Sequence, residues 1–290
     1  MRTRFFIIHN PNAGHETRRL YDAVLSQLER SGAGIEVMET AHHGEGMATA
    51  AAAAQSRRFD TIVAAGGDGT IHDVAEGILD HATPLGIIPI GTANVFAREI
   101  GLPRSPEELA KTLLEGSARE VPVGEVNGRP FLFVVGIGFD AEAVRHFETA
   151  GARNLGRAGL MEPVLRALLS YRDRPLRVEI DGDPTDAHWV IVTRTARYAG
   201  GLMLAPAADP RGTQFHVLCM KGSGPLARIV QLSALAAGYL RFCPGVTLTI
   251  AKQVRIAGGR HIPVQIDGEV LGEVPLNIKV HSRKLTIILP

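Results

Sequence analysis

The segment DTIVAAGGDGT, residues 60–70, contains the most informative pattern in the sequence. Residues 60–65 have the apolar character of a buried strand, and they lead directly into Gly66-Gly67-Asp68-Gly69-Thr70. From residue 71 to 79 the apolar side chains then repeat at helical spacing. A strand, a glycine-rich turn and a helix in this order predict one unit of an open α/β sheet.

The glycine-rich turn has the chemistry of a phosphate site. Glycines let the backbone approach a ligand closely, and the N-terminus of the following helix favours negative charge. Asp68 is acidic, so its presence beside phosphates indicates a bridging cation, as in a magnesium–nucleotide complex. The alternative is a plain tight turn between a strand and a helix.

Two more polar loops follow predicted strands in this half of the chain. Asn10-Pro11-Asn12-Ala13-Gly14 follows the strand at residues 5–9, and Gly91-Thr92-Ala93-Asn94 follows the strand at 85–90. Since the carboxyl ends of parallel strands meet at one edge of a sheet, the three loops predict a shared nucleotide site.

The predicted secondary structure changes near residue 122, from alternating strands and helices to mainly short strands. Residues 121–126 and 131–137 flank Asn127-Gly128, a pair typical of a tight hairpin turn. A helical stretch at about 141–170 and short apolar runs follow, which predict a mainly antiparallel β-sandwich. We therefore expect an α/β Rossmann-like nucleotide domain at 1–122, rejoined by 283–290, and a β-rich domain at 123–282. The runs predicted as strands are 176–180, 189–193, 214–220, 246–250, 254–256 and 264–266.

Net charge, cysteine spacing and the length of apolar runs limit the classes of protein to which this chain can belong. The 290 residues carry a net charge of +1, so no global field indicates a nucleic-acid partner. The cysteines, Cys219 and Cys243, lack metal-ligand spacing and are expected in the core. No stretch reaches the roughly 18 apolar residues of a membrane span. We expect a soluble, cytoplasmic protein without a transmembrane segment, one that would meet a lipid substrate at the membrane surface.

Two familiar nucleotide motifs do not explain the sequence. The pattern G-x-x-x-x-G-K-[ST] does not occur, which excludes a P-loop enzyme. Gly136-x-Gly138-x-x-Ala141 matches the dinucleotide fingerprint, but no clear βαβ unit surrounds it. We therefore do not expect a dinucleotide site there.

The three loops together resemble the catalytic domain of diacylglycerol, sphingosine and bacterial lipid kinases. The motifs that carry the resemblance are NPNAG at 10–14, GGDGT at 66–70 and GTANVFARE at 91–99. The GFDA sequence at 138–141 and Asp267-Gly268-Glu269 extend it over nearly the whole chain. NAD kinases share the GGDG element, but their third loop lacks the G-T-x-N-x-x-A-R pattern that this chain has at residues 91–98.

The resemblance implies a lipid kinase that uses ATP and Mg²⁺, with a cleft between its domains. It implies a catalytic base from Asp267-Gly268-Glu269, with Glu269 favoured over Asp267, and a catalytic or metal-binding role for Asp68. Without the resemblance, Asp267-Gly268-Glu269 would equally suit a solvated turn between two strands. By the same resemblance, the nucleotide contacts are Asn10, Pro11, Gly14, Thr40, Gly66, Gly67, Asp68, Gly69, Thr70, Thr92 and Asn94.

One segment departs from the family pattern. Members often carry P-x-A…D-G, where the aspartate helps to hold a structural magnesium ion. In residues 206–212 of this chain, Arg211 stands before the glycine. An arginine cannot ligate magnesium, so we expect this site to be lost or rebuilt around Asp209.

Several alternatives stay open at this point. The chain could phosphorylate a soluble substrate, as NAD kinases do, or act as a nucleotide or lipid sensor. The lipid could be diacylglycerol, phosphatidylglycerol or a sphingoid base, and a homodimer is compatible with the resemblance. The arginines between Arg145 and Arg177 form either a solvated face or a surface for anionic lipid headgroups. A helical pattern is predicted to pack in the core, with membrane contact as the alternative, through Leu226, Ile229, Val230, Leu232, Leu235 and Tyr239.

Overall fold

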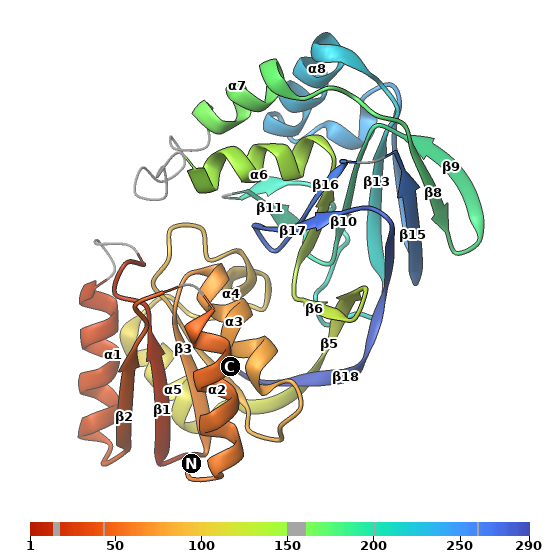
Figure 1. Ribbon diagram of the computed structural model, residues 1–290. Coiled ribbons are helices and arrows are strands. Elements are labelled where there is room, and N and C mark those ends of the chain that lie inside the picture. The colour runs from red at the N-terminus through yellow and green to blue at the C-terminus, as the bar shows by residue number, and fades with distance from the viewer. Residues whose placement is uncertain (14–17, 43, 150–160, 200, 260) are drawn as a thin grey trace. The chain divides into compact units, whose positions relative to one another are not determined.

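A computed structural model describes residues 1–13, 18–42, 44–149, 161–199, 201–259 and 261–290. The chain forms two compact units (Figure 1). Unit 1 comprises Met1–Val123 and Ser282–Pro290, and unit 2 comprises Gly124–His281. The predicted combination of an α/β half and an antiparallel half is confirmed.

Unit 1 is built on a parallel sheet. Its strands run in the order β2 (Gly34–Glu39), β1 (Arg4–His9), β3 (Thr61–Gly66) and β4 (Leu85–Pro89). The last residues of β18 (Leu276–Leu289) add a strand beside β4, with Ile287 opposite Leu85. The helices are α1 (Arg18–Arg30), α2 (Glu45–Ser56), α3 (Asp68–Ile78), α4 (Val95–Glu99) and α5 (Pro106–Glu115).

The strands of unit 1 are buried on both faces, which explains their nearly continuous apolar sequences. Phe5, Ile7 and Val63 pack against α1 and α5. The alternate residues Ile8 and Ile62 are also buried and belong to the face where α2 and α3 lie (Figure 1). Ser105 caps α5, because its hydroxyl oxygen accepts a hydrogen bond from the backbone N–H of Glu108 at 3.2 Å.

Unit 2 contains a six-stranded antiparallel sheet. The order is β14 (Val246–Ala251), β13 (Phe215–Met220), β10 (Trp189–Thr193), β7 (Val134–Ile137), β16 (Pro263–Ile266) and β17 (Glu269–Glu273). An apolar core lies between this sheet and β15 (Gln253–Gly258), β8 (Leu176–Ile180) and the start of β18. The strand β9 (Asp183–Ala187) pairs with β8. The sandwich is therefore formed by two layers, as predicted.

The predicted hairpin at Asn127-Gly128 is present. It joins β5 (Ser117–Val126) to β6 (Arg129–Phe131), with Val126 opposite Arg129. Asn127 and Gly128 both have positive φ, at 49° and 90°, which a two-residue hairpin turn of this kind requires.

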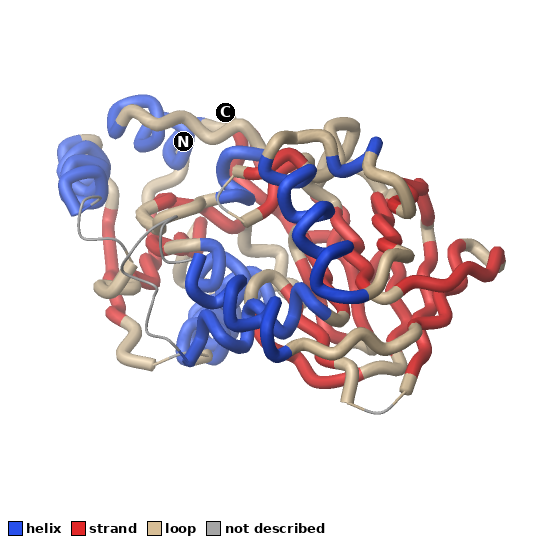
Figure 2. The backbone as a smooth tube through the Cα atoms, turned by 90° about the horizontal axis from the view of Figure 1, so that it is seen from above, coloured by secondary structure: helices blue, strands red, loops and turns tan. Residues whose placement is uncertain are grey.

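The helices of unit 2 lie at one end of its strands (Figure 1), and in the view from above helices lie in front of strands (Figure 2). They are α6 (Phe139–Thr149), α7 (Met161–Ser170), α8 (Gly224–Ala236) and the short 3-10 helix η3 (Leu240–Phe242), and a small hairpin joins β11 (Arg197–Tyr198) to β12 (Leu202–Met203). Among the described residues, no helix combines the length and apolar character needed to cross a membrane.

The prediction for α8 is wrong at four positions. Leu235 is buried, but Leu226, Ile229, Val230 and Tyr239 are exposed. The physical reason is an ion pair of α8 with the chain after α7, which turns a polar face of the helix inward.

Candidate active site

The three polar loops of unit 1 begin at one edge of its sheet. They follow β1, β3 and β4, which are parallel neighbours in register. The side-chain nitrogen of Asn10 donates to Thr70 Oγ1 at 3.3 Å, which connects the first loop to the second. A Cβ on Gly91 would lie 2.3 Å from the Cα of Gly67, so the second and third loops are in direct backbone contact. The structure thus brings together the loops that the sequence predicts to share a site.

Asp68 holds the third loop to the second. Its carboxylate oxygens accept hydrogen bonds from the backbone N–H groups of Val95 at 3.0 Å and Phe96 at 3.1 Å. These are the first two residues of α4, whose N–H groups have no partner within the helix. Asp68 therefore acts as a cap for α4, although it precedes that helix by 27 residues in sequence.

Asn94 fixes the third loop internally. It has a left-handed backbone, with φ 47°. Its side-chain oxygen accepts from Gly91 N at 2.9 Å, and its side-chain nitrogen donates to the carbonyls of Pro89 and Gly91. Loops two and three consequently form one rigid assembly of backbone and short side chains.

The assembly suits a phosphate group. A Cβ on Gly66 would lie 2.3 Å from Thr70 Oγ1, so Gly66 is required for the turn to close. The first turn of α3 includes Gly69 and Thr70, and the backbone N–H groups of a helix's first turn point toward an anion at its N-terminus. This edge of the sheet thus offers the donors and the partial positive charge that an anion needs.

The remaining predicted nucleotide contacts have different surroundings. Thr40 is buried at the end of β2, and its N–H donates to the carbonyl of His9 at 2.9 Å. Pro11 and Thr92 are exposed in their loops. Gly14 lies outside the described residues.

Asp267 is a buried clamp in unit 2. Its carboxylate accepts from the backbone N–H groups of Leu132 at 2.6 Å, Phe133 at 3.0 Å and Val134 at 2.8 Å. Its own N–H donates to the carbonyl of Val134 at 2.9 Å. The carboxylate therefore fixes the segment between β6 and β7, which lies far away in sequence.

Glu269 follows a tight hairpin turn. Asp267 and Gly268, with φ 50° and 94°, form the two-residue turn between β16 and β17, and Glu269 pairs with Ile266. The side chain of Glu269 is half-buried, whereas Asp267 is buried. Glu269 is thus positioned by the paired strands β16 and β17 and by the turn before it, in which Asp267 is held by backbone hydrogen bonds.

A buried polar network supports the same turn. Gln265 donates from Nε2 to Asp140 Oδ2 at 2.7 Å and accepts from Gly268 N at 2.9 Å. The Tyr198 hydroxyl donates to the other oxygen of Asp140. Burial raises the pKa of Asp140, while these two hydrogen bonds favour its ionised form and oppose that rise. Burial and the neighbouring Asp140 raise the pKa of Tyr198 well above its ordinary value.

The glycines at 136 and 138 make this network possible. A Cβ on Gly136 would lie 1.6 Å from Asp140 Oδ2, and a Cβ on Gly138, which has φ 87°, would lie 2.7 Å from the Tyr171 hydroxyl. These glycines therefore allow close packing around β7 and the start of α6. This packing explains the Gly136-x-Gly138 spacing without a dinucleotide site.

Arg194 lies behind the clamped segment. It is almost fully buried and donates to the carbonyls of Leu132 at 3.4 Å and Pro210 at 2.5 Å. Burial lowers the pKa of Arg194 to about 10, against the charges of Asp267 and Asp209, so the guanidinium remains protonated. Sequence reasoning missed Arg194, as it missed Gln265 and Tyr198, because their partners are distant in sequence.

The segment that departs from the family pattern is closed by Arg211. Asp209 Oδ1 accepts from the backbone N–H of Arg211 at 2.9 Å and from its Nε at 3.0 Å. Burial alone would raise the pKa of Asp209, but the hydrogen bonds from Arg211 outweigh it and lower that pKa. Within the described ranges, no three His, Cys, Asp or Glu side chains are grouped as metal ligands. A cation at Asp209 would compete with Arg211.

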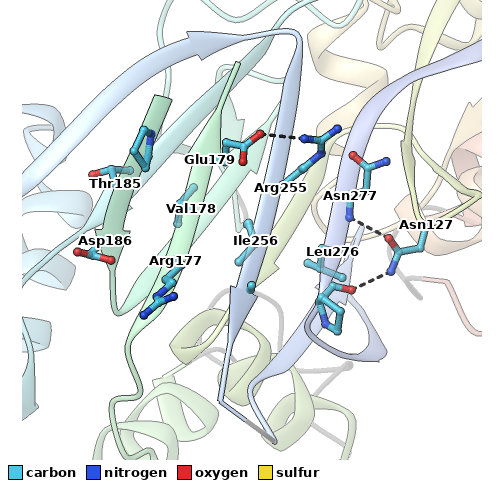
Figure 3. Close-up of a pocket in the computed structure, with 13 residues that line it drawn as sticks. Asn127, Arg177, Val178, Glu179, Thr185, Asp186, Arg255, Ile256, Leu276 and Asn277 are labelled. Carbon is cyan, nitrogen blue, oxygen red and sulfur yellow. Dashed lines mark hydrogen bonds and ion pairs between the residues drawn. The ribbon is translucent and has the colours of Figure 1, made fainter. Parts of the chain in front are cut away.

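A hollow of about 920 Å³ lies on unit 2 (Figure 3). It runs over β8, β9, β15 and the start of β18, with the pair Glu179–Arg255 on its floor at 3.0 Å. Its lining residues, among those described, include none of the predicted site positions. The hollow is therefore a feature of the sheet surface, separate from the motif residues.

Comparison with known proteins identifies the family. The family described as "Diacylglycerol kinase catalytic domain" matches residues 4–126, and "YegS C-terminal NAD kinase beta sandwich-like domain" matches 133–289. A diacylglycerol kinase of Bacillus subtilis (strain 168) is 32% identical over 292 residues, with 98% of this chain and 95% of the relative covered. The chain belongs to the diacylglycerol kinase family.

A further relative has a similar extent, and two solved structures have a similar fold. A diacylglycerol kinase of Staphylococcus carnosus (strain TM300) is 28% identical, covering 99% of this chain and 96% of the relative. The crystal structure of a diacylglycerol kinase from Bacillus anthracis has a TM-score of 0.72 at 20% identity, covering 100% of this chain and 97% of that one. A further Bacillus anthracis structure reaches 0.80 at 22% identity, with 100% and 95% covered. The whole two-unit fold is thus shared.

Proposed function

We propose that this protein transfers the γ-phosphate of Mg-ATP to the hydroxyl group of a lipid, with diacylglycerol as the first substrate to test. The observation that carries the proposal is the contact between the glycine-rich loops of unit 1, held by Asp68 and Asn94. Diacylglycerol comes first because the relatives are named for it.

In this proposal unit 1 binds the nucleotide. Its contacts would come from the loops at 10–14, 66–70 and 91–94 and from Thr40, with the N-terminus of α3 directed at a phosphate. The side chain of Asn10 donates a hydrogen bond to Thr70 Oγ1, so a substitution at either position would disturb the other loop.

The magnesium ion would arrive on the nucleotide. When bound, it supplies charge neutralisation on the phosphate oxygens. Asp68 as a metal ligand stays a prediction, and its two hydrogen bonds to α4 support a positioning task. The hydrogen bonds between Asp209 and Arg211 argue against a second ion on that carboxylate.

Unit 2 would supply the base that takes the proton from the lipid hydroxyl. Asp267 accepts three backbone hydrogen bonds, so both of its carboxylate oxygens are engaged in holding the segment between β6 and β7. Glu269 lies at the start of β17, two residues along, with a half-buried side chain. A carboxylate in such a position can act as a general base. We therefore assign the base to Glu269.

The test is transfer of labelled γ-phosphate from Mg-ATP to lipids in mixed micelles. The panel contains diacylglycerol, phosphatidylglycerol and a sphingoid base, with a lipid-free arm and an arm with NAD⁺. A labelled lipid product supports the proposal and names the substrate class. Product from NAD⁺ without lipid would support the soluble-substrate alternative. Nucleotide binding without any product would support a sensor.

A further inference from the structure

Arg194 is a buried cation whose side chain is surrounded by backbone carbonyls. It follows β10 directly and is 1% exposed. Its guanidinium donates to the carbonyls of Leu132 at 3.4 Å, Pro210 at 2.5 Å and Gly212 at 3.2 Å. Burying a charged group is costly unless its surroundings compensate the charge. Carbonyl oxygens from two separate segments provide that compensation, so the guanidinium joins the segment after β6 to the turn at 209–212.

Two carboxylates contribute negative charge around this cation. Asp267 and Asp209 both favour the charged form of Arg194 electrostatically, against the effect of burial on its pKa. Asp267 accepts from the N–H groups of the segment between β6 and β7, and Arg194 binds the carbonyls of the same segment. The Arg194 side chain binds the carbonyl of Leu132, and its backbone N–H donates to the carbonyl of Phe133 at 2.8 Å. An anion and a cation thus hold one short buried segment together.

The same surroundings have the chemistry of a site for a hard metal ion. Carbonyl and carboxylate oxygens are the ligands that Mg²⁺ prefers, and residues 206–212 are where the family resemblance implies a structural magnesium ion. The residues present do not fit an ion. The guanidinium of Arg194 engages the carbonyls of this turn, and a second cation on them would be repelled. Asp209 Oδ1 accepts from the backbone N–H and from Nε of Arg211. Arginines therefore engage both kinds of oxygen ligand.

A guanidinium is well suited to this task. Its five N–H donors point in several directions within one plane, so a single side chain can bind several carbonyls. Burial lowers the pKa of Arg194 to about 10, so the positive charge persists at neutral pH. Because the group is covalently part of the chain, its contribution to stability does not vary with the concentration of a free ion, as that of a bound metal does.

We propose that Arg194 takes the place of a structural metal ion in unit 2, as a built-in cation that holds the turn at 209–212 to the segment between β6 and β7. Arg211 completes the replacement, because it engages the carboxylate of Asp209. Folding of unit 2 is then independent of divalent metal. The inference goes beyond the proposed function, since it concerns unit 2 without nucleotide and without lipid.

The first test is urea unfolding of the full chain in EDTA or in Mg²⁺, without nucleotide or lipid. Trp189, which is buried in unit 2, reports the transition by fluorescence. We expect the wild type to have the same midpoint in both conditions. Arg194→Met should lower the midpoint by about 1 M or more, because the surrounding carboxylates and carbonyls lose their cation. Mg²⁺ should not restore this loss, since Arg211 still engages Asp209. Arg194→Lys retains the charge without the planar donors, so its midpoint should lie between the two.

The second test removes both arginines from the site. In Arg194→Met/Arg211→Asp the carbonyls of the turn are no longer engaged by a guanidinium, and position 211 regains the aspartate of the family pattern. Mg²⁺ should raise the midpoint of this variant, and electron paramagnetic resonance should show about one bound Mn²⁺, an ion that accepts the same oxygen ligands. Arg228→Met/Arg211→Asp is the matched control. Arg228 is also a buried arginine of unit 2, at 2% exposed, so this variant should be destabilised without binding an ion.

A wild type that binds Mn²⁺ stoichiometrically without nucleotide, or whose midpoint is higher in Mg²⁺ than in EDTA, would overturn the proposal. So would a wild-type midpoint in Arg194→Met. A folded Arg194→Met/Arg211→Asp variant that binds no Mn²⁺ would also contradict it, as would equal binding by the control, because substitution at 211 alone would then create the site. If Arg194→Met does not fold, the wild type and Arg194→Lys still decide. Since neither measurement uses nucleotide or lipid, its outcome is independent of whether the chain phosphorylates a lipid.

Discussion

Two aspartates in Asp-Gly pairs, Asp68 in unit 1 and Asp267 in unit 2, perform a similar structural task in different surroundings. Asp68 accepts two backbone hydrogen bonds at the start of α4, and Asp267 accepts three from the segment between β6 and β7. Asp68 is half-buried among glycines, whereas Asp267 is 5% exposed within a sandwich. An acidic residue in a kinase motif can thus hold the backbone in place.

Because the two aspartates differ in burial, loss of Asp267 should mainly lower stability, whereas loss of Asp68 should mainly lower nucleotide binding. If Asp267 is removed, three N–H groups in a buried region lose their acceptor and water cannot easily replace it. If Asp68 is removed, solvent can reach the loop, so the protein remains folded while the nucleotide loops lose their register. The following predictions test this contrast, ordered by their expected effect on the free energy of unfolding.

Asp267→Ala should have the largest effect. We expect the free energy of unfolding of unit 2 to fall by about 4 kcal/mol, because buried N–H groups are left unsatisfied. The single tryptophan, Trp189, is buried in unit 2 and reports its urea unfolding by fluorescence. Glu269→Ala is the control, with a change of about 0.5 kcal/mol or less. Equal stability of the two variants would contradict the clamp.

Gln265→Leu should have an intermediate effect. It removes the donor to Asp140 and the acceptor of Gly268 N, at a cost of about 2 kcal/mol by the same Trp189 assay. Because the turn before Glu269 loosens, kcat for lipid phosphorylation should fall about ten-fold while the KM for ATP changes little. A rise in the KM for ATP with unchanged kcat would show that the network does not act through the turn.

Asp68→Ala should cost less stability and more activity. Loss of a helix cap lowers the free energy of unfolding of unit 1 by about 1 kcal/mol, measured by far-ultraviolet circular dichroism. The affinity for ATP should fall by at least about ten-fold, since the third loop is no longer held to the second. Asp68→Asn retains one acceptor oxygen and should lie between wild type and alanine. Wild-type ATP affinity in Asp68→Ala would exclude the positioning task.

A third clamping aspartate, Asp60, should give the smallest effect, and it depends on pH. The backbone N–H of Thr3 and the side chain of Arg4 lower the pKa of Asp60 to about 2. A depressed carboxyl pKa stabilises the folded state above the unfolded pKa near 4, and this contribution is lost as the pH falls from about 4 to 2.

Asp60 is partly exposed, so its contribution should be about 1 kcal/mol or less. The difference in unfolding free energy between wild type and Asp60→Asn should therefore shrink between pH 5 and pH 2. A difference that is constant over this range would contradict the ionic origin.

The sequence predicts local features of the fold well. The strand–glycine–helix unit at 60–79, the Asn127-Gly128 turn and the helix cap at Ser105 depend on neighbouring residues, and all are present. The contact between the three loops could also be predicted, because parallel strands place their carboxyl ends together.

Features that depend on distant residues could not be predicted. Asp267 binds residues more than 130 positions earlier, and no periodicity records such a partner. The helical pattern predicts that Leu226, Ile229 and Val230 are buried, but all three are exposed. The pair of Arg228 with Asp173, 55 residues away, places a different face of α8 in the interior. A helical pattern shows that one face is apolar, and tertiary contacts decide which face is buried.

The most direct test of the account compares Glu269→Gln with wild type in single-turnover transfer of labelled phosphate from Mg-ATP to diacylglycerol in mixed micelles. We predict a rate lower by about 10²–10⁴-fold, because the amide cannot accept the hydroxyl proton, with ATP affinity and the Trp189 unfolding curve unchanged. A rate within about three-fold of wild type would contradict the assignment of the base.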